Sequence, residues 1–348
     1  MENINEAIKA PQLHLYNAIP DALSRIPVEE LDSVIPGPSL IYIEGKTEPP
    51  LFISVLLHGN ETTGFLAIQK LIQELNLESG PAPRSIILFI GNIAAAKKRL
   101  RRLEDEPDYN RIWNGGSLPE HVLAKAVLAE LSKQNLFAAV DIHNNTGKNP
   151  HYACINRTDP SYINLARRFS KTIVYFTEPH EVISMALSRL CPSVTLESGF
   201  SGETEGTNHV QNYLVQCLTL EAGVLFSPPS NRHKDIFHTI GKITVPCNSH
   251  LGFGNCTDKA DLCFRDDLEE LNFTQVAAGT KLGISGKNSC FLRVVDNNNN
   301  DITGRYFQVD NQDIVTRKQF IPSMFTKNET VIHQDCFGYI MEPYPIGE

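Results

Sequence analysis

The sequence predicts an α/β protein with a mostly parallel, wound sheet flanked by helices and a smaller β-rich domain at the C-terminal end. From about residue 40 to residue 240, short apolar runs alternate with amphipathic stretches, the pattern of a wound parallel sheet. After residue 240 the apolar runs are separated by Gly, Asn and Asp, which favours β structure. A chain of 348 residues is long enough for two domains. We expect them at residues 1–240 and 241–348.

Short β-branched and apolar runs predict the strands of the larger domain: 51–57, 85–92, 136–143, 171–176 and 193–197. The stretches that begin at Thr62 and at His121 have apolar residues at helical spacing. In the smaller domain we expect strands within 242–247, 280–285, 290–295, 305–309 and 336–341. The tract from Asp296 to Asp301, DNNNND, predicts a polar hairpin turn.

Composition excludes some classes of partner. The formal net charge of -9 argues against a nucleic-acid-binding surface, because phosphate contacts need clustered Lys and Arg. No run approaches the roughly 18 apolar residues that span a bilayer, and the N-terminus lacks the layout of a signal peptide. We therefore expect a cytoplasmic protein without a membrane partner. The eight cysteines form no CxxC pair and are predicted to be free thiols. The oligomeric state is not indicated.

Polar residues at predicted strand ends suggest a metal centre. His58 follows the first strand, Glu61 stands three residues later, and His143 ends the third strand. In open α/β sheets such residues converge at the carboxyl edge. Two His and one carboxylate with an open fourth position form a catalytic zinc set. We predict one Zn²⁺ per chain on these three residues, with Asp141 as a carboxylate that orients a ligand imidazole.

Glu197 ends the predicted strand SVTLE and is the candidate general base. A carboxylate that faces the metal could take a proton from the attacking water and pass it to a leaving nitrogen. The alternative for this residue is a glutamate that caps a strand at a turn.

Four phrases then resemble one family. HGNE (residues 58–61), YNRIW (109–113), DIHNNT (141–146) and TLESG (195–199) are similar, in content and order, to motifs of the succinylglutamate desuccinylase and aspartoacylase group of zinc-carboxypeptidase-like enzymes. The resemblance implies a mostly parallel sheet, a β-rich C-terminal domain, and zinc-dependent hydrolysis of a small N-acyl amino acid. It places the metal ligands on His58, Glu61 and His143, and the base on Glu197.

The resemblance also implies pocket residues. Its substrate-binding pair falls on Asn110 and Arg111, which suit a carboxylate, and Asn144 matches a further position, with a turn residue as the alternative. An arginine that stabilises the oxyanion should precede Asn110. Arg99, Arg101 and Arg102 are the candidates, and we choose Arg102, which requires a one-residue insertion. Arg189 is the nearby candidate for selecting an acidic side chain.

Two other functions remain open from the sequence. The same site would serve a metallocarboxypeptidase if its pocket admitted a longer peptide. A non-catalytic relative that binds a small ligand is the second alternative, although it would have no need of a base beside an open metal position.

Overall fold

The chain folds into two compact units. The structure, a computed structural model, describes residues 10–228, 236–256, 260–286 and 291–344. The first unit comprises residues 1–144, 151–173 and 179–232, and the second comprises 145–150, 174–178 and 233–348. The expected boundary at residue 240 falls inside β9 (Ile236–Thr244), a strand of the second unit.

A mostly parallel sheet forms the centre of the first unit, as predicted. Its strands run in the order β1 (His14–Tyr16), β2 (Ser39–Ile43), β4 (Ile86–Ile90), β3 (Leu51–Val55), β5 (Ala138–His143), β8 (Ser193–Glu197) and β6 (Tyr152–Ile155). Strands β4, β3, β5 and β8 are parallel to one another, whereas β2 is antiparallel to β4 and β6 is antiparallel to β8. Every residue of β3, β4 and β5 is buried, because helices cover both faces.

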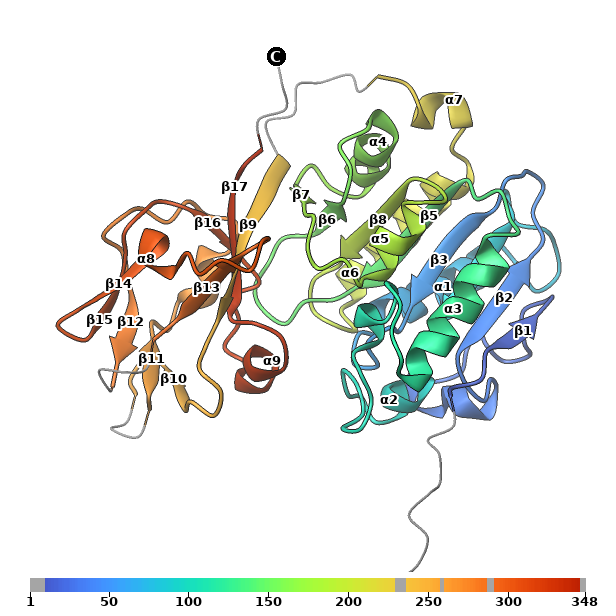
Figure 1. Cartoon of the computed structure of the whole chain (residues 1–348). Helices are drawn as coiled ribbons and strands as arrows, with labels where there is room; N and C mark the ends of the chain where they lie inside the picture. The colour runs from blue at the N-terminus through green and yellow to red at the C-terminus, as the bar shows by residue number, and fades with distance from the viewer. Residues whose placement is uncertain (1–9, 229–235, 257–259, 287–290, 345–348) are drawn as a thin grey trace, which may run out of the picture. The chain divides into compact units, whose positions relative to one another are not determined.

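The helices of the first unit are α1 (Thr63–Glu74), α2 (Ile93–Lys97), α3 (Pro119–Leu131), α4 (Pro160–Phe169), α5 (Ile183–Leu187), α6 (Thr204–Leu218) and α7 (Ala222–Leu225), with 3₁₀ segments at Val28–Ser33 and Tyr109–Arg111. In Figure 1, α3 and α5 lie in front of the sheet and α1 and α6 behind it. On the front face, Val127 of α3 and Ile183 of α5 share a core with Phe52 and Phe89. None of the helices in the described residues is long and apolar enough to cross a membrane.

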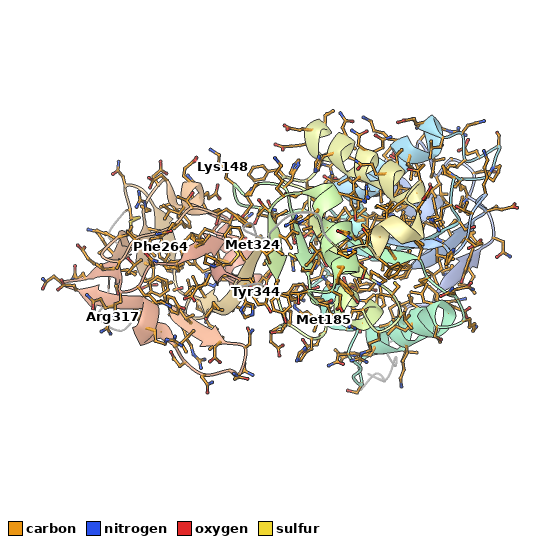
Figure 2. The ribbon with its side chains drawn as sticks, turned by 90° about the horizontal axis from the view of Figure 1, so that it is seen from above. Lys148, Met185, Phe264, Arg317, Met324 and Tyr344 are labelled. Atoms are coloured by element: carbon orange, nitrogen blue, oxygen red, sulfur yellow. A yellow bond between two sulfur atoms is a disulfide. The ribbon has the colours of Figure 1, made fainter. Side chains whose placement is uncertain are left out.

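The second unit is rich in β structure. Strand β9 pairs antiparallel with β13 (Arg293–Asp296) and β17 (Gly338–Pro343), and β17 also pairs with β16 (Ile321–Ser323). A separate sheet has the order β10 (Leu251–Phe253), β11 (Leu262–Phe264), β12 (Lys281–Ser285), β15 (Asp313–Thr316) and β14 (Phe307–Asp310). The remaining elements are α8 (Thr303–Tyr306), α9 (Glu329–Gln334) and a 3₁₀ segment at Leu268–Leu271. Phe264, labelled in Figure 2, packs 4.3 Å from Phe337 between ring centroids.

The predicted turn and strands differ from the structure in detail. The turn at residues 296–301 is confirmed, because Asp296 Oδ1 accepts the N–H groups of Asn298 and Asn300 and the chain returns antiparallel. The run 171–176 forms the short β7 (Ile173–Tyr175), whose first residue is grouped with the first unit and whose other two residues are grouped with the second. The sequence did not indicate β6, whose four residues are too few to show a period.

One disulfide corrects the prediction of free thiols. Cys256 and Cys263 are joined, seven residues apart. Strands β10 and β11 run side by side and set Cys263 opposite Gly252, whose missing side chain leaves room for the sulfur of Cys256. The absence of CxxC spacing therefore gave no indication of this disulfide, because its two cysteines approach each other only when β10 and β11 pair. Cys290 lies outside the described residues.

Candidate metal centre

The predicted metal residues meet at the carboxyl edge of the parallel strands. His58 follows β3, His143 ends β5, and Glu197 ends β8. His143 and Glu197 are direct partners in the β5–β8 register. Parallel strands end at one edge of a sheet, which explains why residues 85 positions apart in the sequence become neighbours here.

The turn that carries His58 and Glu61 is shaped by a close approach of two backbones. Leu56 has a left-handed φ of 55°, and Glu61 N–H donates to His58 O at 3.1 Å. A Cβ on Gly59 would lie 2.2 Å from the backbone nitrogen of Ala96 in α2. Gly59 is therefore the residue that lets α2 pack against this turn.

Replacing Gly59 with alanine is expected to lower the melting temperature of the metal-free protein. The new methyl group must displace α2, and such overpacking costs ~1–3 kcal/mol. Gly80→Ala is the matched control, since a Cβ there meets no atom within 4 Å. Thermal melts of the two variants beside wild type check this. Equal melting temperatures for Gly59→Ala and Gly80→Ala would contradict it.

The three predicted ligands present one set of donor atoms. Glu61 Oε1 lies 2.8 Å from His58 Nδ1, and Glu61 Oε2 lies 2.8 Å from His143 Nδ1. The two Nδ1 atoms are 3.2 Å apart. All three residues are buried, and among the described residues they are the single group of His, Cys, Asp and Glu with donor atoms close enough to hold a metal ion. Two imidazole nitrogens and a carboxylate fit Zn²⁺.

The ionisable side chains of this cluster shift one another's pKa values. Burial alone would raise the pKa of Glu61, but His58 and His143 hold that pKa well below its usual range. Burial alone would lower the pKa of His143, but Asp141 and Glu61 raise it well above its usual range. The centre therefore keeps an anionic carboxylate in the protein interior, where a cation would be stabilised.

Each candidate histidine is held from behind by an aspartate. His143 Nε2 lies 2.7 Å from Asp141 Oδ2, which confirms the predicted contact, and Ser54 Oγ donates to Asp141 Oδ1 at 2.6 Å. His58 Nε2 lies 2.8 Å from Asp108 Oδ1, a residue that sequence reasoning missed. A carboxylate accepts the Nε2 hydrogen and so leaves each Nδ1 lone pair facing the centre.

Arg101, rather than Arg102, reaches this cluster. Arg101 donates to Asp108 Oδ2 from Nη2 at 2.9 Å, and its Nη1 lies 3.4 Å from Glu61 Oε1. The guanidinium of Arg102 donates to backbone carbonyls of its own loop, of which Glu106 O is the nearest at 2.8 Å. Arg189 precedes β8 and therefore lies at the opposite edge of the sheet from Glu197.

Asn110 and Arg111 lie in a 3₁₀ segment beside the centre. Asn110 Nδ2 lies 3.2 Å from His143 Nε2, and Asn110 Oδ1 accepts Ile183 N–H at 3.0 Å. Arg111 is partly buried, and its Nη1 donates to Asn110 O at 2.9 Å. The structure thus brings this predicted pair next to the metal residues.

The side chain of Asn144 is engaged within the fold. Its amide nitrogen donates to Thr63 Oγ1 and Gly199 O, both at 2.9 Å, and its Oδ1 accepts Thr63 N–H at 3.3 Å. Its backbone N–H donates to Glu61 Oε2 at 3.1 Å. These contacts join the start of α1 to the loop after β8, which is a structural task close to the centre.

Glu197 has an unusual environment for a carboxylate. Its Oε2 is buried and has no hydrogen-bond partner among the described residues. Burial, which outweighs the nearby His143 and Arg101, raises the pKa of Glu197 to about 8. A group with such a pKa can both accept and return a proton near neutral pH.

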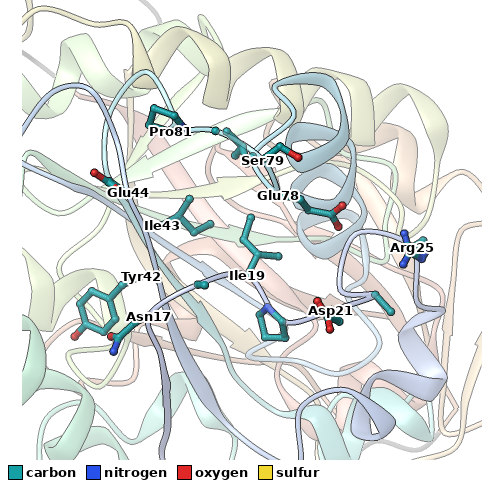
Figure 3. Close-up of a pocket in the computed structure, with 15 residues that line it drawn as sticks. Asn17, Ile19, Asp21, Arg25, Tyr42, Ile43, Glu44, Glu78, Ser79 and Pro81 are labelled. Carbon is teal, nitrogen blue, oxygen red and sulfur yellow. The ribbon is translucent and has the colours of Figure 1, made fainter.

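A cavity of about 460 Å³ lies near the amino ends of the parallel strands, away from the candidate metal centre. Figure 3 shows its lining, which includes Ile43, Glu44 and Glu78. Ile43 pairs with Ile86, where β4 begins, so this cavity adjoins the amino ends of the parallel strands. It contains none of the candidate metal residues.

Fold and site together define an α/β protein with a two-histidine, one-carboxylate centre at the carboxyl edge of a parallel sheet. The model of the succinylglutamate desuccinylase/aspartoacylase catalytic domain matches residues 47–233, more than half of the chain. The chain belongs to this family, which confirms the resemblance and places it among desuccinylase- and aspartoacylase-type hydrolases.

Solved structures agree with this fold. A succinylglutamate desuccinylase/aspartoacylase from Rhodobacter sphaeroides matches with a TM-score of 0.58 at 15% identity, over 88% of this chain and 89% of that one. The succinylglutamate desuccinylase from Chromobacterium violaceum matches with a TM-score of 0.56 at 16% identity, over 88% and 87%. Murine aminoacylase 3 matches with a TM-score of 0.51 at 13% identity, over 86% and 97%. No curated protein matched the sequence.

Proposed function

We propose that this protein is a zinc-dependent amidohydrolase that cleaves the amide bond of a small N-acyl amino acid. The observation that carries the proposal is the arrangement of the two histidines. Both turn Nδ1 toward the carboxylate of Glu61, and both have Nε2 held by an aspartate. Such outer carboxylates are typical of histidines that bind metal.

Zinc on His58, Glu61 and His143 would polarise the scissile carbonyl and make a water nucleophilic near neutral pH. Glu197 is the proposed base, whose carboxylate takes the proton of the attacking water and returns it to the departing nitrogen. Its raised pKa and its neighbouring position on β8 support this role. The family resemblance, which places the general base on Glu197, supports this role as well.

Arg101 is the proposed partner of the oxygen that becomes negative during attack, in the place for which the sequence suggested Arg102. Its contact with Glu61 puts the guanidinium beside the metal residues. Asn110 and Arg111 are proposed to bind the carboxylate of the substrate, since a guanidinium and an amide supply matching donors.

N-succinyl and N-acetyl acidic amino acids are the proposed substrates. Support comes from the family model, which names succinylglutamate desuccinylase and aspartoacylase, and from matched structures described as desuccinylases and an aminoacylase.

The test combines metal analysis of the purified protein with an amine-release assay. Wild type is expected to contain about one zinc per chain and to hydrolyse N-succinyl or N-acetyl amino acids but not dipeptides. Protein stripped by a chelator is the control, and its activity should return when zinc is added.

Each contrary result identifies a different alternative. Absence of metal binding would contradict the central claim. Hydrolysis of dipeptides alone would identify a metallocarboxypeptidase. Bound zinc without turnover on any substrate would identify a non-catalytic relative.

A further inference from the structure

One face of the central sheet is polar around the candidate base. Residues that pair in register share a face, so Asp141 of β5, Thr195 and Glu197 of β8, and Cys154 of β6 lie on the same side. Burial of a polar group costs free energy unless the group is bonded or used, so each of these side chains needs a role. The opposite face of the three strands is apolar and buried, and carries Val140, Ile142, Val194, Leu196, Ala153 and Ile155.

Cys154 is the member of this polar face without an assigned role. Thr195 is buried, and its Oγ1 donates to Ser184 Oγ of α5 at 3.0 Å. Cys154 is a free cysteine and remains partly exposed, although its strand pairs directly with β8. Burial and the charges of Glu197 and Asp141 raise the pKa of its thiol well above the usual range. The thiol therefore stays neutral and lies near the base as a small, uncharged group.

The proposed carboxylate-binding pair lies over the same face. Asn110 Oδ1 accepts the N–H of Ile183, the first residue of α5, and α5 lies in front of the sheet (Figure 1). The carboxylate of the substrate is therefore held on the front face, while the scissile amide must reach Glu197 at the end of β8. The Cα of the substrate lies between these two groups, and the polar face is the surface that its side chain meets.

We infer that Cys154 is a specificity-determining residue, which lines the part of the pocket that receives the side chain of the N-acyl amino acid and limits its length. The inference rests on the proposed function and deepens it, since it concerns the substrate of the same site. Cys154 takes no part in the chemical step, because Glu197 serves as the base. A larger side chain at position 154 should exclude longer substrates and leave the zinc in place.

The first test compares Cys154→Leu with wild type on the N-acyl derivatives of aspartate and glutamate, which differ by one methylene. In a pocket, one methylene is worth roughly 10- to 200-fold in kcat/KM. We expect Cys154→Leu to lower the ratio of kcat/KM for glutamate to kcat/KM for aspartate by roughly 10-fold or more. General damage to the site lowers both values and cancels in this ratio. Cys154→Ala, which enlarges the pocket, should raise it.

Cys154→Ser and Cys247→Leu are the controls. Serine is nearly the same size as cysteine, so Cys154→Ser should keep the wild-type ratio and turnover. Loss of turnover in this variant would assign the thiol a chemical role and overturn the inference. Cys247→Leu makes the large substitution at an exposed cysteine and should also keep the ratio. Thermal melts report folding, and Cys154→Val replaces Cys154→Leu if the leucine variant does not fold.

Binding without turnover gives a second readout. Calorimetry on zinc-loaded Glu197→Gln measures the affinities of the same two compounds. Adding Cys154→Leu should weaken binding of the glutamate derivative by roughly 10-fold more than binding of the aspartate derivative.

The outcomes separate this inference from the proposed function. If wild type hydrolyses N-acyl amino acids and Cys154→Leu leaves the ratio unchanged, the inference fails and the proposed function stands. A Cys154→Leu variant that discriminates only between N-acetyl and N-succinyl groups would place the acyl chain beside Cys154 and also overturn the inference. A wild type without turnover, combined with the expected shift in affinities, would defeat the proposed function and support the inference. If neither compound binds or is hydrolysed, both fail.

Discussion

Replacing His143 with alanine is expected to remove the zinc and lower hydrolysis by at least ~10³-fold. The variant keeps two of the three donors, too few for a stable catalytic site. It also leaves the buried carboxylates of Glu61 and Asp141 without the imidazole that lies between them. Metal analysis after dialysis and initial rates on the substrate identified for wild type measure both effects.

His209→Ala is the control for this substitution. His209 lies in α6, and its Nε2 contacts Phe169 O at 2.7 Å, away from the candidate donors. This variant should retain zinc and turnover. A chelator should lower the melting temperature of wild type and His209→Ala but leave His143→Ala unchanged, because only a bound ligand stabilises the fold by mass action. Full zinc content in His143→Ala would show that the ligand set is different.

Glu197→Gln is expected to keep its zinc and lose roughly 10²-fold or more in kcat. The amide is nearly the same size as the carboxyl group but cannot take up a proton, so the loss measures acid-base catalysis. Glu203→Gln, the same change at an exposed neighbour in the loop that follows, should have normal turnover. Near-normal kcat in Glu197→Gln would remove this residue from the mechanism.

Glu197→Gln, which lowers kcat, is expected to stabilise the metal-free protein at high pH. Burial raises the pKa of Glu197 from 4.5 to about 8, so the folded chain holds this proton more tightly than the unfolded chain. Stability is therefore lost as pH rises from 4.5 to 8, by on the order of 5 kcal/mol, and the loss is complete above pH 8. Glutamine carries no charge and escapes this loss.

Thermal melts of chelated protein at two pH values test this sign. Glu197→Gln should melt above wild type at about pH 9 and close to wild type at about pH 4. Glu203→Gln should follow wild type at both. A metal-free Glu197→Gln that melts below wild type at the higher pH would show that the carboxylate is stabilised by contacts absent from this structure.

The sequence was sufficient to predict the residues that regular structure places. His58, His143 and Glu197 each follow or end an apolar run, and the ends of parallel strands must lie at one edge. Asp141 could be predicted to contact His143 because residues two apart on a strand share a face. The family motifs added Asn110 and Arg111, which a 3₁₀ segment brings beside His143.

The remaining site residues lie in irregular backbone, where the sequence shows no pattern that would place them. Arg101 and Arg102 are adjacent in a loop that has no hydrophobic period. The sequence therefore does not indicate that Arg101 contacts Glu61 whereas Arg102 contacts backbone carbonyls of its own loop. Asp108 follows in the same segment, where no pattern indicates which aspartate will face His58. Asn144 adjoins a candidate ligand, but its four-way bonding within the fold depends on the loop after β8.

The β5–β8 register has a consequence for how this chain could change in evolution. An insertion or deletion of one residue inside either strand would turn His143 or Glu197 to the opposite face of the sheet. Such a length change would remove that side chain from the candidate centre. The loop from residue 98 to residue 107 has no such register. It can lengthen or shorten as long as one arginine still meets Asp108. The position of that arginine can therefore drift along the gene among relatives while its place in space is kept.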